Sequence, residues 1–188
     1  MTQQELNPYA APRAQVADRP FADPGGTLFF PAGLSKLSVM SVVTFGLYEV
    51  YWFYKNWSDI KTREGIKINP VLRAIFYPLF AYSAFKRIKD KGAEVGAQTG
   101  YSPGALATAV FLLIASTYLP DPVWLISLLS FVPLLPVQSA VNRINAKVAP
   151  DADRNTRFSG WNVFGVVLGI LFWAVVLLGL FVPIEAVD

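Results

Sequence analysis

The last helix-length segment of the chain, residues 161–184, reads WNVFGVVLGILFWAVVLLGLFVPI and contains no charged side chain. A helix of about 20 apolar residues is as long as the hydrocarbon core of a bilayer is thick. Charged residues make up only 15% of the whole chain, against about a quarter in soluble domains, and hydrophobic residues make up 54%. The sequence therefore predicts an integral membrane protein whose last transmembrane helix is 161–184.

An earlier apolar segment, residues 37–57, has a similar length. It contains a single acid, Glu49, and ends in an aromatic cluster typical of a membrane interface. We expect it to form one transmembrane helix. Residues 70–85 are shorter and contain Arg73 and Pro78, so they fit a short span, a re-entrant segment or an interfacial helix.

The middle of the chain carries two more apolar segments, 104–119 and 121–141, which meet at Leu-Pro-Asp-Pro. This tight connection predicts a helical hairpin. Pro133 and Pro136 are expected to bend its second arm, because a proline inside a helix removes a hydrogen bond and clashes with the preceding turn.

A nine-residue pattern, S-A-x-x-R-I-x-x-K, occurs twice, at 83–91 and 139–147. Each copy follows an apolar run that contains Pro-Leu, which favours a duplicated helical hairpin, with coincidence as the open alternative. In either case Ser, Arg and Lys at these spacings share one stripe of a helix. Cations near the C-terminus of a helix also complement its dipole.

We therefore predict an all-α fold, a polytopic membrane bundle of four to five transmembrane helices. Residues 1–27 are rich in Pro and Ala and are expected to form a flexible tail. The remaining domain, 28–188, would contain a first hairpin at 36–91, a second hairpin at 101–147 and the last helix at 161–184. A duplicated hairpin followed by a fifth helix would account for this order.

The basic residues of the two nonapeptides mark the expected cytoplasmic ends of helices, since Lys and Arg gather on that side of a membrane. They are candidates for simple interfacial anchoring or for a specific site for anionic lipid or a partner. These residues are Lys86, Arg87, Lys91, Arg143 and Lys147. Because the cations lie beside apolar runs, the sequence pI of about 9.2 does not indicate nucleic-acid binding.

Five crossings would put the N-terminus in the cytoplasm and the acidic C-terminus outside. This topology leaves the basic loop 55–69 outside, against the usual charge distribution. The alternative keeps 55–103 wholly inside and exports the N-terminal tail. We favour five crossings.

Glu49 is the most informative single residue, because an ionisable group within a span is costly and usually has a partner. We expect an ion pair between Glu49 and Arg73 that joins two antiparallel helices. Hydration at the interface and a proton or substrate role are the alternatives. Gly165 and Gly169 form a G-x-x-x-G pattern that permits close helix packing, within the bundle or in a dimer.

No catalytic, cofactor or metal site is predicted. The chain has neither histidine nor cysteine, which removes the commonest general base, the thiolate nucleophile and the commonest metal ligands. No phosphate-binding glycine loop, nucleophile elbow or zinc spacing occurs either. These observations argue against an enzyme.

The strings TFGLYEVYWFYKNW at 44–57 and NPVLRAIFYPLFAYSAFKRI at 69–88 resemble an uncharacterised family of small bacterial integral membrane proteins. The NPYAAP segment at 7–12 is similar to the tail of some members. The resemblance implies a location in the bacterial cytoplasmic (inner) membrane. It implies no substrate, and no functional residue carries over.

Three function classes remain open at this point. We favour a non-enzymatic membrane scaffold or accessory subunit, whose partners are the lipid bilayer and a protein bound by the tail or the cytoplasmic loops. A small transporter or lipid-handling protein that uses Glu49 and Arg73 between helices is the alternative. A membrane enzyme is the least favoured class.

Overall fold

The structure is a computed structural model that describes residues 26–181. The predicted tail therefore lies outside the described residues except for Gly26 and Thr27. Every regular element of the described chain is a helix, which confirms the all-α prediction. The elements are α1 (Leu34–Val43), α2 (Leu47–Glu64), α3 (Pro70–Ile75), α4 (Tyr77–Glu94), α5 (Pro103–Ala115), the 3₁₀ helices η1 (Ser116–Tyr118) and η2 (Val123–Phe131), α6 (Leu134–Val148) and α7 (Gly160–Phe181).

Local sequence signals explain where several helices begin. Asn69 caps α3, because its side-chain oxygen accepts hydrogen bonds from the N–H groups of Val71 and Leu72 at 3.0 and 3.3 Å. Ser102 caps α5 in the same way. In both helices proline occupies the first turn, where its missing N–H costs nothing.

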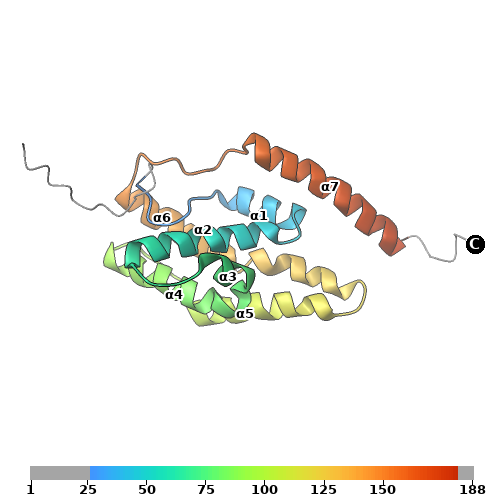
Figure 1. Ribbon diagram of the computed structural model, residues 1–188, viewed down its shortest axis with the longest axis horizontal. Coiled ribbons are helices and arrows are strands. Elements are labelled where there is room, and N and C mark those ends of the chain that lie inside the picture. The colour runs from blue at the N-terminus through green and yellow to red at the C-terminus, as the bar shows by residue number, and fades with distance from the viewer. Residues whose placement is uncertain (1–25, 182–188) are drawn as a thin grey trace, which may run out of the picture.

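The chain reverses direction between α1 and α2, so the prediction of one continuous span over 37–57 is wrong. Helix α1 ends at Val43, and Phe45 and Gly46 both have positive φ, at 51° and 83°. Glycine adopts this left-handed conformation without steric cost. Helix α2 then runs back beside α1, and the two form a short hairpin (Figure 1).

The second half of the chain forms the hairpin α5–η1–η2–α6. In the same view α5 lies at the bottom of the bundle, and α6 lies at the upper left (Figure 1). Its return arm, Val123–Val148, begins as a 3₁₀ helix and continues as α6. Helices α4 and α6 pack against each other, and α3 packs on α2. The core between these helices is aromatic, with Trp52, Phe53 and Phe85 fully buried.

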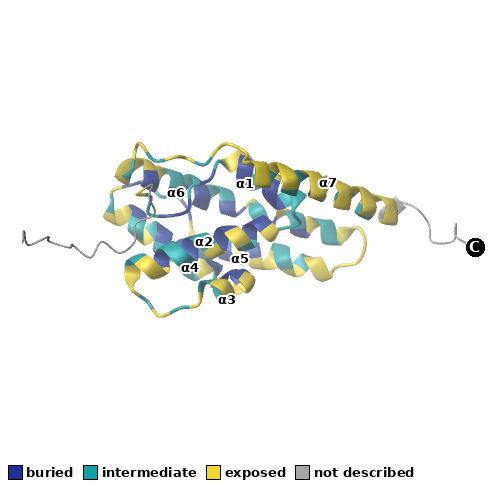
Figure 2. Cartoon of the chain, turned by 45° about the horizontal axis from the view of Figure 1, so that its top comes forward, coloured by how far each residue is buried: buried dark blue, intermediate teal, exposed yellow. Residues whose placement is uncertain are grey.

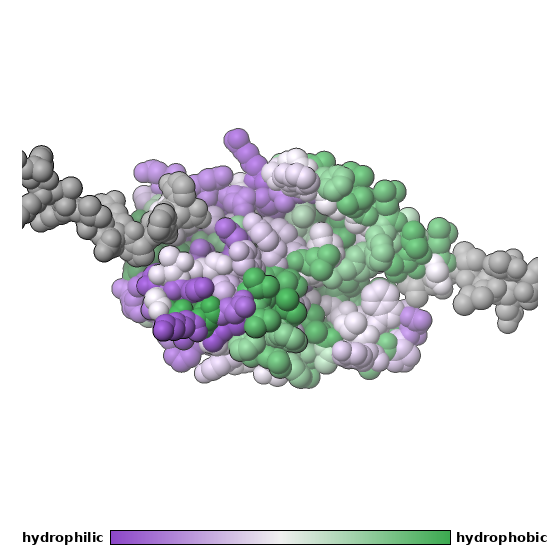
Figure 3. Space-filling view, viewed as in Figure 1, coloured by the Kyte–Doolittle hydropathy of each residue, from purple (hydrophilic) through white to green (hydrophobic). Residues whose placement is uncertain are grey.

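Polar and apolar residues gather at opposite ends of the molecule, as Figure 3 shows. Four stretches, 37–54, 74–85, 104–135 and 158–181, contain no Lys or Arg, and their only acids are Glu49 and Asp121. These stretches form the ends of the hairpins and α7. The basic residues lie in the segments between them.

Helix α7 lies along one side of the bundle, packs on α1 and is largely exposed (Figure 2). The most apolar 18 residues of its segment Gly160–Gly179 have a mean hydropathy of 2.4, and only 6% of these 18 residues are buried. Val123–Val148 is the other described helix that is long and apolar enough to cross a membrane, with a mean hydropathy of 1.7. The four to five transmembrane helices expected from the sequence are therefore not confirmed.

Gly169 makes the contact between α7 and α1 possible. A Cβ atom at this position would overlap the carbonyl oxygen and Cγ1 of Val43. One turn earlier, a Cβ atom at Gly165 would lie 3.6 Å from the end of the Met40 side chain, an ordinary contact. Further along, the Trp173 indole donates a 3.1 Å hydrogen bond to the carbonyl of Val42. Both glycines thus face the protein's own α1.

Candidate functional site

Glu49 lies in the first turn of α2 and is 1% exposed. Its two carboxylate oxygens each accept a hydrogen bond, from the Tyr77 hydroxyl at 3.1 Å and from the Ser130 hydroxyl at 2.8 Å. Tyr77 begins α4 and Ser130 belongs to η2. One carboxyl group therefore links three elements within the apolar half of the protein.

A cavity of about 170 Å³ is lined by Tyr77 and Ser130, the two residues that bind the Glu49 carboxylate. Thr117, Ser127 and apolar residues of α2, α5 and η2 complete the lining. A carboxylate next to hydroxyl groups in an apolar setting can hold a proton or a small cation.

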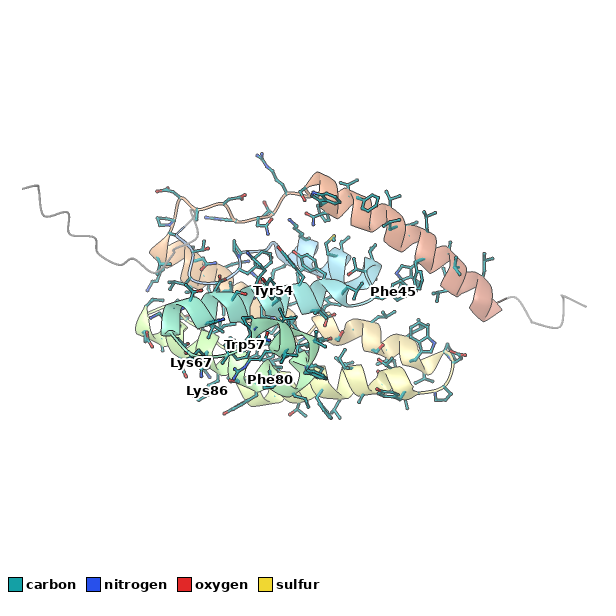
Figure 4. All side chains as sticks on the ribbon, in the orientation of Figure 1. Phe45, Tyr54, Trp57, Lys67, Phe80 and Lys86 are labelled. Atoms are coloured by element: carbon teal, nitrogen blue, oxygen red, sulfur yellow. The ribbon has the colours of Figure 1, made fainter. Side chains whose placement is uncertain are left out.

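The predicted ion pair between Glu49 and Arg73 is not formed. The Arg73 guanidinium lies 4.3 Å from the ring centre of Trp57 and 5.1 Å from that of Phe80. Figure 4 labels these two aromatic residues. The reason is the turn at Gly46: α2 starts at Leu47, so Glu49 lies at the apolar end of the hairpin, while Arg73 on α3 packs beside Trp57, farther along α2. Arg73 is thus stabilised by aromatic faces and not by an acid.

The two nonapeptides lie on α4 and α6, and the structure gives their shared residues a common role. Ala84, Ile88, Ala140 and Ile144 are fully buried where these helices pack. The Ser, Arg and Lys positions lie toward the surface. The sequence pattern thus contains an Ala-Ile core stripe in addition to its basic residues.

The five basic candidates all have partners within the protein. Arg87 pairs with Glu64, Lys91 with Glu94 at 2.6 Å, and Lys86 with Asp90 at 2.6 Å. The hydrogen bond to Asp90 raises the pKa of Lys86.

The two basic residues of the second nonapeptide hold the chain that follows α4. Arg143 donates a 3.0 Å hydrogen bond to the carbonyl of Gln98, and Lys147 donates to the carbonyls of Gly96 and Val95. Cations that bind carbonyl groups just after the C-terminus of a helix also complement its dipole. Both side chains therefore join α6 to the end of α4.

The structure also contains a buried polar cluster that sequence reasoning missed. The irregular segment 28–32 passes between α2 and α6, and side-chain amides form hydrogen bonds with its backbone. Asn145 accepts hydrogen bonds from the N–H groups of Leu28 and Phe29 at 3.0 and 3.2 Å and donates to the Phe29 carbonyl at 2.8 Å. Asn142 donates to Ala32 at 2.9 Å.

Two further amides complete this cluster. Asn56 of α2 accepts from the Phe30 N–H at 3.3 Å, and Gln138 of α6 accepts from the Trp52 indole. Gln138 and Asn56 are both fully buried. Amide residues at core positions of apolar helices were the sequence signal for this cluster, because a buried amide needs partners.

The described residues contain no group of three or more metal-ligating side chains. Comparison of the whole sequence with protein-family models gives no match, and no curated protein or solved structure is significantly similar to it. The fold and the geometry of these clusters are therefore the basis for any proposal about function.

Proposed function

We propose that this chain is a multi-pass protein of the bacterial cytoplasmic membrane that serves as a non-enzymatic scaffold or accessory subunit. The observation that carries the proposal is the exposed apolar surface of α7: its most apolar 18 residues have a mean hydropathy of 2.4, and only 6% of them are buried. In water such a surface would be strongly unfavourable, at about 25 cal/mol per Å² of apolar area. In a bilayer the same surface contacts acyl chains.

In the proposed topology the basic end of the molecule faces the cytoplasm. The hairpin α5–η1–η2–α6 enters the bilayer and returns, and α7 crosses it once. The hairpin α1–α2 inserts partly into the bilayer without crossing it. This arrangement has fewer crossings than the four to five expected. It places the loop 55–69 on the same side as the other basic segments, so the conflict with the positive-inside tendency disappears.

The scaffold role is supported by what lies at the basic end. The described chain begins there at Gly26, so the preceding Pro/Ala-rich residues are joined to the cytoplasmic side. Neither histidine nor cysteine occurs anywhere in the sequence, which leaves few groups for hydrolytic or redox chemistry. A tail and basic loops that meet a protein partner are the simplest use of this surface.

Single-cysteine labelling tests the topology, because the natural chain has no cysteine and each variant carries one thiol. With a membrane-impermeant maleimide on intact cells, Lys67→Cys and Lys147→Cys are expected to stay unlabelled until the membrane is opened. Asp121→Cys, at the tip of the second hairpin, is expected to react from outside. Extraction of the protein by alkaline carbonate, or labelling of all three variants from outside, would contradict the proposal.

Affinity purification in mild detergent, followed by mass spectrometry, tests the scaffold role. The full-length chain is expected to retain a specific protein partner, and a variant without residues 1–25 is expected to lose it or bind it more weakly. If both forms purify without any partner, the scaffold role is wrong even though the membrane topology stands.

A second candidate function, a small transporter, is favoured by the cavity lined by Tyr77 and Ser130, the partners of Glu49. Here Glu49 would carry a proton or cation without the help of Arg73. Loss of a transported flux in Glu49→Gln, at unchanged abundance in the membrane, would support this candidate over the scaffold role.

A further inference from the structure

A groove of about 450 Å³ lies between the start of α7, the first turn of α1 and α2. Its lining includes Lys36, Tyr48, Asn155, Ser159 and Trp161. None of the residues that line it is acidic. The groove lies where the basic segments meet the uncharged ones, since Lys36 precedes the stretch 37–54 and Trp161 opens α7.

Lys36 is a buried cation without a carboxylate partner. The residue is 4% exposed, and its amine donates hydrogen bonds to the Asn155 side-chain oxygen at 2.6 Å and to the Arg157 carbonyl at 2.9 Å. Both acceptors are neutral. Asp153 acts on the amine electrostatically but forms no salt bridge with it. A buried ammonium group is stable only when it is well paired, so this position favours an additional anion.

Tyr48 gives a second, independent sign of a ligand. This residue is 6% exposed, and its hydroxyl group has no hydrogen-bond partner. Buried hydroxyl groups are nearly always hydrogen-bonded, so this one lacks an acceptor, and the residue that carries it lines the groove. A phosphate oxygen would serve as that acceptor.

The beginning of α7 adds further donors to the same groove. Ser159 and Asn162 cap this helix reciprocally: the Asn162 side chain accepts from the Ser159 N–H at 3.0 Å, and the Ser159 hydroxyl accepts from the Asn162 N–H at 3.4 Å. The other N–H groups of a first helical turn have no acceptor within the helix. Together with the positive end of the helix dipole they favour an anion.

We propose that this groove binds the headgroup phosphate of an anionic phospholipid, whose acyl chains lie along the exposed apolar face of α7. The proposal rests on the membrane insertion proposed above. A phospholipid fits better than free phosphate, because Trp161 is 83% exposed at the mouth of the groove and the uncharged surface of α7 leads away from it. An anionic headgroup fits better than an ammonium headgroup, because the lining contains no acid.

Native mass spectrometry of the full-length chain tests this inference. The protein is released from detergent micelles after titration with phosphatidylglycerol of one acyl composition, and the population with one bound lipid is measured. Lys36→Gln is expected to weaken binding about tenfold, because it removes a charge-assisted hydrogen bond to the phosphate. Tyr48→Phe is expected to weaken binding about threefold, because it removes one neutral hydrogen bond. Lys61→Gln and Tyr82→Phe remove an exposed amine and an exposed phenol away from the groove, and are expected to bind lipid like the natural chain.

Tyr48→Phe keeps the test decisive if Lys36→Gln does not fold. Because the Tyr48 hydroxyl has no partner in the protein, its removal is expected to leave the melting temperature of the lipid-free protein unchanged while lipid binding falls. The inference is overturned if Lys36→Gln and Tyr48→Phe both bind phosphatidylglycerol like the natural chain. It is also overturned if 10-fold excess inorganic phosphate, or phosphatidylethanolamine, occupies the site as well as phosphatidylglycerol.

These results separate the two proposals. A protein that resists carbonate extraction but shows no preference for phosphatidylglycerol would leave the membrane location standing and remove the lipid site. A protein that carbonate releases would remove the membrane location first.

Discussion

The contact between Gly169 and Val43 allows a sharp test of how α7 is held. In Gly169→Ala the added methyl group overlaps a backbone carbonyl, which cannot rotate away, so α7 must move off α1. Overpacking of this kind costs about 1–3 kcal/mol, and the higher helix propensity of alanine returns roughly 1 kcal/mol. With the clash on backbone, near the top of that range, we expect a net loss of about 2 kcal/mol in the free energy of unfolding.

Gly165→Ala is the matched control, because it lies on the same helix and on the same face. Its added methyl group would meet only the end of the Met40 side chain at 3.6 Å. This variant is expected to be neutral or more stable by about 0.5–1 kcal/mol. The two variants should therefore differ by about 2–3 kcal/mol in the free energy of unfolding, although each makes the same chemical change.

Thermal unfolding in dodecyl maltoside, followed by circular dichroism and by tryptophan fluorescence, measures this difference. Gly169→Ala is expected to lower the melting temperature by roughly 4–8 °C, since 1 kcal/mol corresponds to about 2–4 °C in a chain of this size. The ring of Trp173 stacks on that of Phe45, with the ring centres 4.7 Å apart. A change in tryptophan fluorescence is therefore expected at a lower temperature than the loss of helix content. Equal shifts in both variants would refute the packing and would point to a dimer that uses both glycines.

The remaining predictions concern the buried polar groups and one surface pair. Glu49→Gln and Arg73→Ala are expected to change the free energy of unfolding additively, within about 0.5 kcal/mol, because the two residues share no contact. A double-mutant cycle that shows a larger coupling energy would support the ion pair and contradict this geometry. Asn145→Ala is expected to cost about 2–4 kcal/mol, measured by chemical denaturation, because it leaves buried backbone groups without partners. Lys86→Gln, which removes an exposed pair with Asp90, is expected to leave the melting temperature unchanged at neutral pH. Because the pKa of Lys86 is raised, any stabilisation from the pair is present at neutral pH and is lost as pH rises above that pKa, so a pH titration of stability checks the sign.

The helical class and the most apolar segment were predictable from the sequence, because both depend on local composition. A run without charge such as 161–184 has few ways to be stable outside lipid. The turn between α1 and α2 was not predicted, although Phe45-Gly46 was a signal for it. Apolar composition on both sides of that glycine hid the reversal, since hydropathy does not distinguish one long helix from two short ones.

The candidate site was predicted only in part for the same reason. The sequence indicated that Glu49 is an ionisable group within an apolar segment and needs a partner, but the partners in the structure are hydroxyl groups on α4 and η2 and not Arg73. Their approach depends on the tertiary fold, which the spacing of Glu49 and Arg73 does not encode. The amides that hold residues 28–32 could have been found as polar residues on apolar helix faces.

The way that residues 28–32 are held has a consequence for biosynthesis. Leu28 is bound by a side chain that lies 117 positions later in the chain. At about 5–20 residues per second, the ribosome needs on the order of 6–20 s to supply that side chain. During this interval the hairpin α1–α2 has been made, while the N–H and carbonyl groups of the segment before it still lack their amide partners. The basic end therefore closes only after α6 has been made, and a chain that stops before α6 would leave the backbone groups of residues 28–32 without these amide partners.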